Sequence, residues 1–338
     1  MKRVLTSALM FFAVHAGQGI AGVSQSLPAS ENERLLSAVL LVRGSVAGNA
    51  VGSFGVFTRS GEDTVWSRAT KAKLLAFGLG LFDNGRTRRY YIAGGSGVHR
   101  STDGGLSWKI ITSWRTEEVL CVVPDPVDSA VVYIATPFGV FKTIDDGLTW
   151  VRKMNGFASW YVQRIVMDHR DRSTLYAATE RDLFKTTDAG ETWKPMRTGV
   201  ENLLAVLQHP SNGDVILISG EDQGVLRTTD GGKSWSNTKG LGNATVYTFR
   251  ASSSGEELYA AGWRTGLWRS TDNGESWKQV WGGPETEALY SIFVHPRDPR
   301  HLMVGTVGLG IYESLDHGET WRYAGLRGAQ VKQIELYP

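Results

Sequence analysis

The chain of 338 residues has 41% hydrophobic content, enough to bury a sizeable core, and its 40 glycines and 12 tryptophans suit an all-β chain with many turns. Without Lys2 and Arg3, the 36 basic residues fall to 34 and balance the 34 acidic residues, which argues against a nucleic-acid partner. The single cysteine, Cys121, excludes an internal disulfide, and its apolar surroundings predict a buried, inert thiol.

The beginning of the chain has the features of an export signal. Two basic residues precede an apolar run from Val4 to Val14, and small residues follow it. We expect a signal peptide over residues 1–21 and a short polar leader over residues 22–34. The run is too short for a membrane span, and no other segment approaches 18 apolar residues. The mature protein is therefore expected to be secreted or periplasmic.

One pattern, hydroxyl-x-Asp-x-Gly-x-hydroxyl-Trp, recurs every 42 to 44 residues. Its six aspartates are Asp103, Asp145, Asp188, Asp230, Asp272 and Asp316. A seventh, degraded copy ends at Trp66, which lies 42 residues before Trp108. This spacing indicates a repeat protein of seven units over residues 35–338.

Each copy lies between a short apolar strand and an extended segment that begins at the tryptophan, so the pattern predicts the turn of a β-hairpin. The aspartate is expected to accept hydrogen bonds from backbone N–H groups two or three residues further on. The glycine is expected to supply a positive φ. The six aspartates are therefore predicted to be structural, and the spacing lacks the pattern of a calcium-binding loop.

Each unit reads as four strands in about 42 residues, which is the dimension of one propeller blade. First strands such as Val162–Met167 and second strands such as Leu258–Ala261 are short apolar runs. We predict a single all-β domain, a seven-bladed β-propeller of four-stranded antiparallel blades. The run 330–337 matches a first strand but has no second strand after it, so we expect it to complete the N-terminal blade and close the ring. The alternative inner strand is Ala38–Val42.

Binding residues are expected on the face opposite the repeated turns, in the loops that surround the central channel. The candidates are Arg115, Glu117, Phe138, Trp160, Tyr161, Arg181, Glu201, Trp263, Arg264 and Glu287. Aromatic, arginine and carboxylate side chains that converge on one concave face are typical of a ligand site. The alternative is that they are ordinary solvated loop residues.

Five cations immediately precede repeated turns. They are Arg100, Lys142, Lys185, Arg227 and Arg269. They form either a basic arc for an acidic partner or a set of strand-end charges that keeps sheet edges soluble. The second interpretation is favoured, because charges on outer strands are common.

The repeated pattern resembles the Asp-box, or BNR repeat, of sialidases, xyloglucanases, sortilin-type receptors and photosystem II assembly factors. The resemblance covers residues 35–338 and implies a β-propeller. By length, one box per unit and export signal, the chain is most similar to the photosystem II assembly factor family, whose members are non-catalytic and bind proteins. It lacks the lipid-anchor cysteine of cyanobacterial members, and no feature ties it to photosystem II.

The glycosidase branches of the resemblance fit less well. The chain has no Arg-Ile-Pro signature of sialidases, and xyloglucanases use two propellers where this chain has length for one. It also has no nucleophile elbow, phosphate loop, dinucleotide fingerprint or metal-ligand spacing. We therefore predict no catalytic residue, no cofactor and no metal, in a monomer that binds a protein partner. The alternative is a carbohydrate-active or carbohydrate-binding propeller, with Glu117 and Glu201, or Glu201 and Glu287, as its carboxylate pair.

Overall fold

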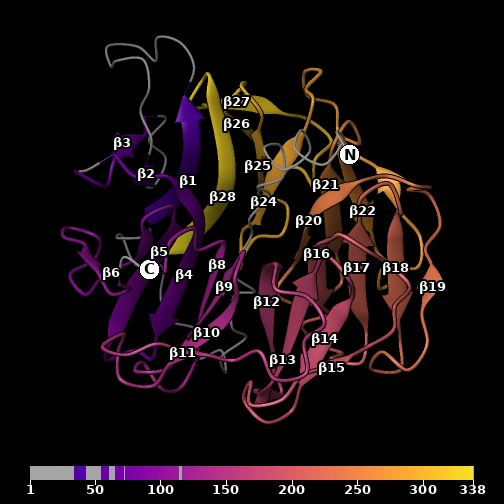
Figure 1. Ribbon diagram of the computed structural model, residues 1–338. Helices are drawn as coiled ribbons and strands as arrows, with labels where there is room; N and C mark the ends of the chain where they lie inside the picture. The colour runs from indigo at the N-terminus through magenta and orange to yellow at the C-terminus, as the bar shows by residue number, and fades with distance from the viewer. Residues whose placement is uncertain (1–33, 43–54, 61–64, 72, 114–115, 338) are drawn as a thin grey trace, which may run out of the picture.

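The protein is an all-β propeller of four-stranded antiparallel sheets (Figure 1). The computed structural model describes residues 34–42, 55–60, 65–71, 73–113 and 116–337, with the backbone alone for residues 34–42. The described residues contain strands and turns and no helix. None of their segments is a helix long and apolar enough to cross a membrane.

Each sheet has an innermost, a second, a third and an outermost strand. The innermost strands are β4 (Ala76–Asp83), β8 (Cys121–Pro124), β12 (Val162–Asp168), β16 (Leu203–Gln208), β20 (Val246–Ala251), β24 (Leu289–Val294) and β28 (Ala329–Tyr337). The second strands are β1 (Arg34–Val42), β5 (Arg88–Gly94), β9 (Val132–Thr136), β13 (Asp171–Thr179), β17 (Ile216–Gly220), β21 (Leu258–Gly262) and β25 (Leu302–Thr306). The third strands are β2 (Gly55–Ser60), β6 (Gly97–Ser101), β10 (Gly139–Thr143), β14 (Leu183–Thr186), β18 (Val225–Thr228), β22 (Leu267–Ser270) and β26 (Ile311–Ser314). The outermost strands are β3 (Ser67–Arg68), β7 (Lys109–Ile110), β11 (Val151–Arg152), β15 (Lys194–Pro195), β19 (Ser236–Asn237), β23 (Lys278–Gln279) and β27 (Arg322–Gly325).

Six sheets, from β4 to β27, follow the chain in order, and a further sheet joins its two ends in the order β28-β1-β2-β3. Figure 1 shows the yellow β28 beside the indigo β1, and β28 also lies against β24 and β4. The C-terminal strand therefore pairs with β1 as expected, and Ala38–Val42 belongs to the second strand of that sheet rather than to its inner strand. The count of seven blades stays a prediction, because this last sheet includes segments outside the described residues.

The degraded repeat holds the same place in its hairpin as the complete repeats. Thr58 pairs with Ser67 across β2 and β3, as Arg100 pairs with Lys109 across β6 and β7. Trp66 therefore precedes its outermost strand as Trp108 precedes β7.

Sheet packing explains why the second strands read as continuous apolar runs. Every residue of β9, β17, β21 and β25 is buried. Each of these sheets packs against a neighbour on both faces, so neither face of its second strand reaches solvent. A strand buried on both faces loses the alternation of apolar and polar residues.

Each repeated turn is closed by hydrogen bonds within itself. Ser101 Oγ donates to Asp103 Oδ1 over 2.7 Å, and the Ser107 backbone N–H donates to the same oxygen over 2.9 Å. The N–H of Gly105, at a φ of 85°, donates to Ser101 Oγ over 2.8 Å. The same bonds recur in the other five copies.

These bonds correct one expectation in part. The aspartate accepts mainly from the backbone N–H of the residue four positions further on. The N–H three positions further on also contributes, as that of Lys233 does to Asp230 over 2.8 Å, so the expectation holds in part. The hydroxyl residue at the start of the turn takes the nearer N–H groups instead, including that of the aspartate itself.

Candidate functional site

Each of the five cations before the repeated turns has a close partner within the protein. Three of them donate to a backbone carbonyl in the turn of the next sheet: Arg100 to Asp146 over 2.9 Å, Lys142 to Ala189 over 3.0 Å and Arg227 to Asn273 over 2.7 Å. The accepting residues all have positive φ. This contact ties each sheet to the next, a role that neither interpretation of the sequence included.

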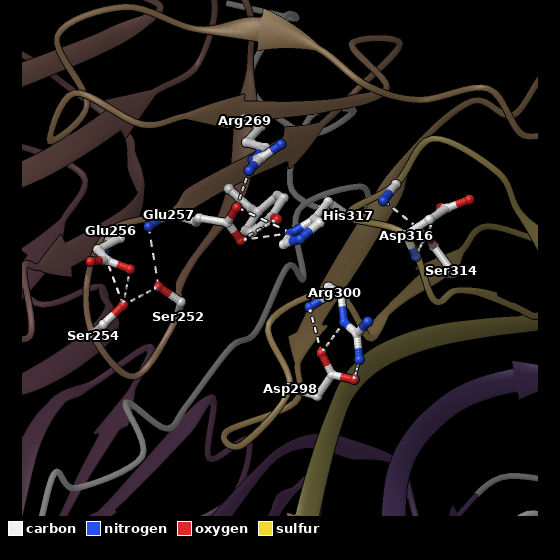
Figure 2. A network of polar contacts seen from close by, with 12 residues as sticks. Ser252, Ser254, Glu256, Glu257, Arg269, Asp298, Arg300, Ser314, Asp316 and His317 are labelled. Atoms are coloured by element: carbon white, nitrogen blue, oxygen red, sulfur yellow. Dashed lines mark hydrogen bonds and ion pairs between the residues drawn. The ribbon is translucent and has the colours of Figure 1, made fainter.

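The other two cations also have close neighbours. Lys185 Nζ lies 5.4 Å from the ring centroid of Tyr176, and Arg269 forms an ion pair with the buried Glu257. Figure 2 shows that His317, from the turn of the next sheet, approaches the same carboxylate, 3.1 Å from Nδ1 to Oε1. Arg269 thus joins a polar network between two sheets.

Two cavities lie at equivalent places between an outermost strand and the next repeated turn. One of about 640 Å³ is lined by Arg100, Phe141 and Trp150, and one of about 540 Å³ by Arg269, Trp281 and His317. Among the described residues, none of the candidates on the opposite face lines either cavity. The described residues contain no cluster of three or more His, Cys, Asp or Glu side chains that could hold a metal ion.

A β-bulge recurs near the beginning of the innermost strands and leaves one residue out of register with the second strand. Register shifts fall at Phe77, Gln163, Leu204, Tyr247 and Tyr290. Such a bulge re-aims a side chain, and the rings of Tyr247 and Tyr290 stack across two sheets with centroids 5.0 Å apart. Phe77 likewise packs against Leu120, which precedes β8.

The C-terminal strand adds a cation to this set. Lys332 Nζ lies 3.6 Å from the ring centroid of Tyr290, and burial lowers the pKa of Lys332 to about 7. We call the seven buried residues the axial ring: Phe77, Leu120, Gln163, Leu204, Tyr247, Tyr290 and Lys332.

Two predicted site residues pack on the axial ring from different sheets. Tyr161 contacts Phe77 and Leu120, and burial, with Glu118 and Glu180 nearby, raises the pKa of Tyr161 to about 12. Trp263 packs against the cluster that contains Tyr247 and Tyr290.

Arg264 and Glu287 adjoin Trp263. The guanidinium carbon of Arg264 lies 5.5 Å from the Trp263 ring centroid, and the Arg264 N–H donates to the carbonyl of Glu287 over 2.8 Å. The structure therefore brings Trp263, Arg264 and Glu287 together.

A second group of predicted residues forms an exposed surface. Trp160 is 65% exposed and Phe138 is 56% exposed. Arg152, at the end of β11, joins them: its Nε donates to the Phe138 carbonyl over 2.9 Å, and its guanidinium carbon lies 4.8 Å from the Trp160 ring centroid. We call Phe138, Arg152 and Trp160 the aromatic patch. Because Tyr161 follows Trp160 in the chain, the patch adjoins the axial ring.

The remaining candidates are not joined to these groups. Glu117 and Arg181 are exposed, and the Glu201 carbonyl accepts a hydrogen bond from Gln223. No hydrogen bond or ion pair of the described residues links Glu201 to Glu117 or Glu287. Arg115 lies outside the described residues.

Sequence reasoning missed Arg152 and all seven residues of the axial ring. Arg152 stands two residues after a repeated tryptophan, where a surface charge is ordinary, so its sequence position carried no signal. Most residues of the axial ring look like any others in an apolar strand. Lys332 is the exception, because a charged residue within such a strand is a signal that the sequence shows.

Comparisons with known proteins agree with a propeller. The family described as Sortilin-Vps10 (Sortilin, neurotensin receptor 3) matches residues 138–260. No curated protein matches the sequence.

Solved structures with the same fold include enzymes and a peptide-binding protein. The GH74 xyloglucanase from Xanthomonas campestris is 17% identical with a TM-score of 0.61, covering 72% of this chain and 44% of that enzyme. YCF48 bound to a D1 peptide is 15% identical with a TM-score of 0.54, covering 72% of this chain and 80% of that protein. A putative 6-phosphogluconolactonase from Bacteroides uniformis is 12% identical with a TM-score of 0.61, covering 91% of this chain and all of that protein. The chain thus spans less than half of the xyloglucanase, and at these identities the likeness shows a shared β-propeller fold alone.

Proposed function

We propose that this protein is a non-catalytic propeller that binds a segment of a partner protein on the face opposite the repeated turns. The observation that carries the proposal is the exposed Trp160, with the guanidinium of Arg152 over its ring and Phe138 bonded to the same arginine. Tryptophan and arginine are the residue types most often responsible for interface energy.

Exposure of the aromatic patch supports the proposal. Large aromatic side chains that stay in water lose the free energy of burial, and burying one stabilises a complex by ~1.5–3 kcal/mol. The patch is also pre-ordered, because its arginine is already held against both aromatic residues. A surface ordered before binding loses less conformational entropy when a partner docks.

The likeness to YCF48 favours a peptide ligand, because that structure contains a bound D1 peptide and the propeller spans most of its chain. A xyloglucanase-like activity has less support. The chain spans under half of that enzyme, and the predicted carboxylates are spread over separate loops.

A carbohydrate ligand is the second candidate function. Exposed aromatic rings also stack on sugars, so the same aromatic patch could form a sugar platform. The fold is shared with GH74 enzymes, so a sugar ligand is tested beside the peptide ligand.

Several finer properties belong to the proposal. We propose that the repeats are Asp-boxes of the BNR type, and that the sheet β28-β1-β2-β3 is the seventh blade. We also propose one folded domain over residues 35–338, exported through a signal peptide over residues 1–21 and acting as a monomer without cofactor or metal. A mass spectrum of the exported protein would test removal of residues 1–21. Its mass in solution would test whether it is a monomer.

The test compares three forms of the protein: wild type, a Phe138→Ala/Trp160→Ala variant, and a Leu106→Ala/Leu148→Ala control. The control removes exposed apolar side chains, 74% and 84% exposed, from the repeated turns. Each form is panned against a displayed random-peptide library and applied to a glycan array.

We expect wild type and control to select the same peptides and the patch variant to lose them, with all three melting temperatures close. Exposed substitutions of this kind change stability by about 0.5 kcal/mol or less. Peptides retained by the patch variant would contradict the assignment of the surface. Glycans bound by wild type and lost by the patch variant would favour the carbohydrate ligand instead.

A further inference from the structure

Charged side chains from the innermost strands of three alternate sheets, one buried and two partly buried, lie one to three residues beyond the axial ring. Arg164 lies on β12, Arg250 on β20 and Glu335 on β28. Arg250 and Glu335 form an ion pair, and Gln333 donates from Nε2 to Glu335 Oε1 over 2.7 Å. The positive charge of Arg250 is close enough to Arg164 to lower the pKa of Arg164. Because β16 separates β12 from β20 around the ring, these two arginines approach each other on the axial side.

Arg164 is the member of this group whose charge is not balanced. Its residue is 5% exposed, and its Nη2 atom is buried without a hydrogen-bond partner among the described residues. Glu335 is engaged by Arg250 and Gln333. Burial lowers the pKa of Arg164 to about 10, with a further decrease from Arg250, so the guanidinium stays charged at neutral pH. Two arginines and one glutamate leave one net positive charge, and Arg164, which is buried, is in a place where charges are normally paired.

The positions equivalent to Arg164 in the neighbouring sheets have small side chains. Its position is the first after the bulge, and the equivalent residues of the other sheets between β4 and β27 are small. They are Gly78, Cys121, Ala205, Thr248 and Ser291. The head group of Arg164 therefore has no long side chain beside it from the equivalent positions of these sheets.

We propose that this axial site binds one small planar monoanion, of the carboxylate or nitrate type, against Nη2 of Arg164, with Arg250 as the second positive group. A planar anion matches the guanidinium fork, which donates two parallel hydrogen bonds to adjacent oxygens. A single negative charge balances the one positive charge that the protein leaves. The bound anion links sheets that do not touch, so it stabilises the closed ring.

Thermal unfolding in the presence of sodium formate tests the site. Ionic strength is held constant with the salt of a bulky sulfonate buffer, which is too large for a buried site. The melting temperature of the wild type should rise by a few degrees with formate and then saturate, because a ligand of the folded state stabilises it in proportion to its occupancy. Arg164→Met should lose this response. Arg181→Met, an exposed arginine on the same sheet, is the matched control and should respond as the wild type does.

Two results would overturn the proposal. An equal response of Arg164→Met and wild type would show that formate acts elsewhere. In formate-free buffer, Arg164→Met should melt at or above the wild type, because methionine keeps the apolar stem without the unbalanced charge. A much lower melting temperature would show that the protein itself already neutralises Arg164. The Phe138→Ala/Trp160→Ala variant should keep the formate response, so failure here is separable from failure of the proposed binding surface.

Discussion

At the scale of single residues, the aspartates of the repeated turns act on their own backbone. Each accepts hydrogen bonds from a hydroxyl before it and from the N–H and hydroxyl of the residue four positions after it. A carboxylate used in this way is stabilised in its charged form. These side chains therefore have a complete structural role without a substrate or a metal.

This role predicts a loss of stability in acid. Hydrogen bonds from within the turn, led by a side-chain hydroxyl, lower the pKa to about 2 in Asp103, Asp145, Asp188 and Asp316. An aspartate with a folded pKa below its unfolded value of about 3.9 stabilises the fold at higher pH and loses that effect as pH falls through the folded pKa. We expect the free energy of unfolding to decrease between about pH 4 and pH 2, measured by urea unfolding at each pH. In Asp103→Asn the decrease should be smaller, and an unchanged stability down to pH 2 would contradict this account.

Residue identity also limited what the sequence could predict about the site. Trp160, Tyr161 and Trp263 could be predicted because aromatic residues in loops on one face are uncommon enough to stand out. Arg152 could not, since its contact with Trp160 depends on the path of the loop that separates them. Tyr247 and Tyr290 could not either, because a β-bulge depends on register with the second strand, which one strand's sequence does not show.

At the scale of elements, one contact between neighbouring sheets recurs at three of the repeated turns. The cation at the end of a third strand reaches the carbonyl of a residue with positive φ in the next turn. The sequence showed the cations but not their partners, because the partner lies more than forty residues further along the chain. The four-strand unit itself was predictable, since it depends on local apolar runs and turns.

Lys142 provides a test of this contact. Its ammonium donates to the Ala189 carbonyl over 3.0 Å and lies 5.2 Å from the Tyr133 ring centroid. Lys142→Met should lower the free energy of unfolding by about 1 kcal/mol, because the substitution removes a charged donor and leaves the Ala189 carbonyl with the Tyr133 hydroxyl alone. Lys194→Met, at an exposed lysine of the next sheet, should change it little. Equal effects of the two substitutions in denaturant unfolding would show that the contact does not stabilise the fold.

At the scale of the whole molecule, the sheet built from both chain ends holds the ring closed. β28 pairs with β1 on one side and packs against β24 and β4. Tyr337 also meets the ring of Tyr90 edge-on, with centroids 4.6 Å apart, so the last strand contacts the sheet that starts with β4. The sequence predicted this pairing because the run 330–337 reads as the first strand of a sheet, and β28 does pair with β1.

Deletion of residues 329–338 should therefore affect the protein far from the deletion. The apolar surfaces of β24 and β4 would lose their cover, and the axial ring would lose Lys332. We expect the truncated chain to lose cooperative thermal unfolding and to bind a hydrophobic dye, as observed by calorimetry and fluorescence. A sharp transition near the wild-type temperature would show that the remaining sheets close without β28.

The position of β28 also sets the order of events during biosynthesis. The strand that covers β24 and β4 leaves the ribosome after the six sheets from β4 to β27, so those sheets exist for some time with two uncovered edges. Residues 43–328 separate the end of β1 from the start of β28. At about 5–20 residues per second, this segment takes from about 14 seconds to about a minute to appear. During this interval β1 is available to strands of other chains, and a chaperone that occupies it would protect the protein until β28 arrives.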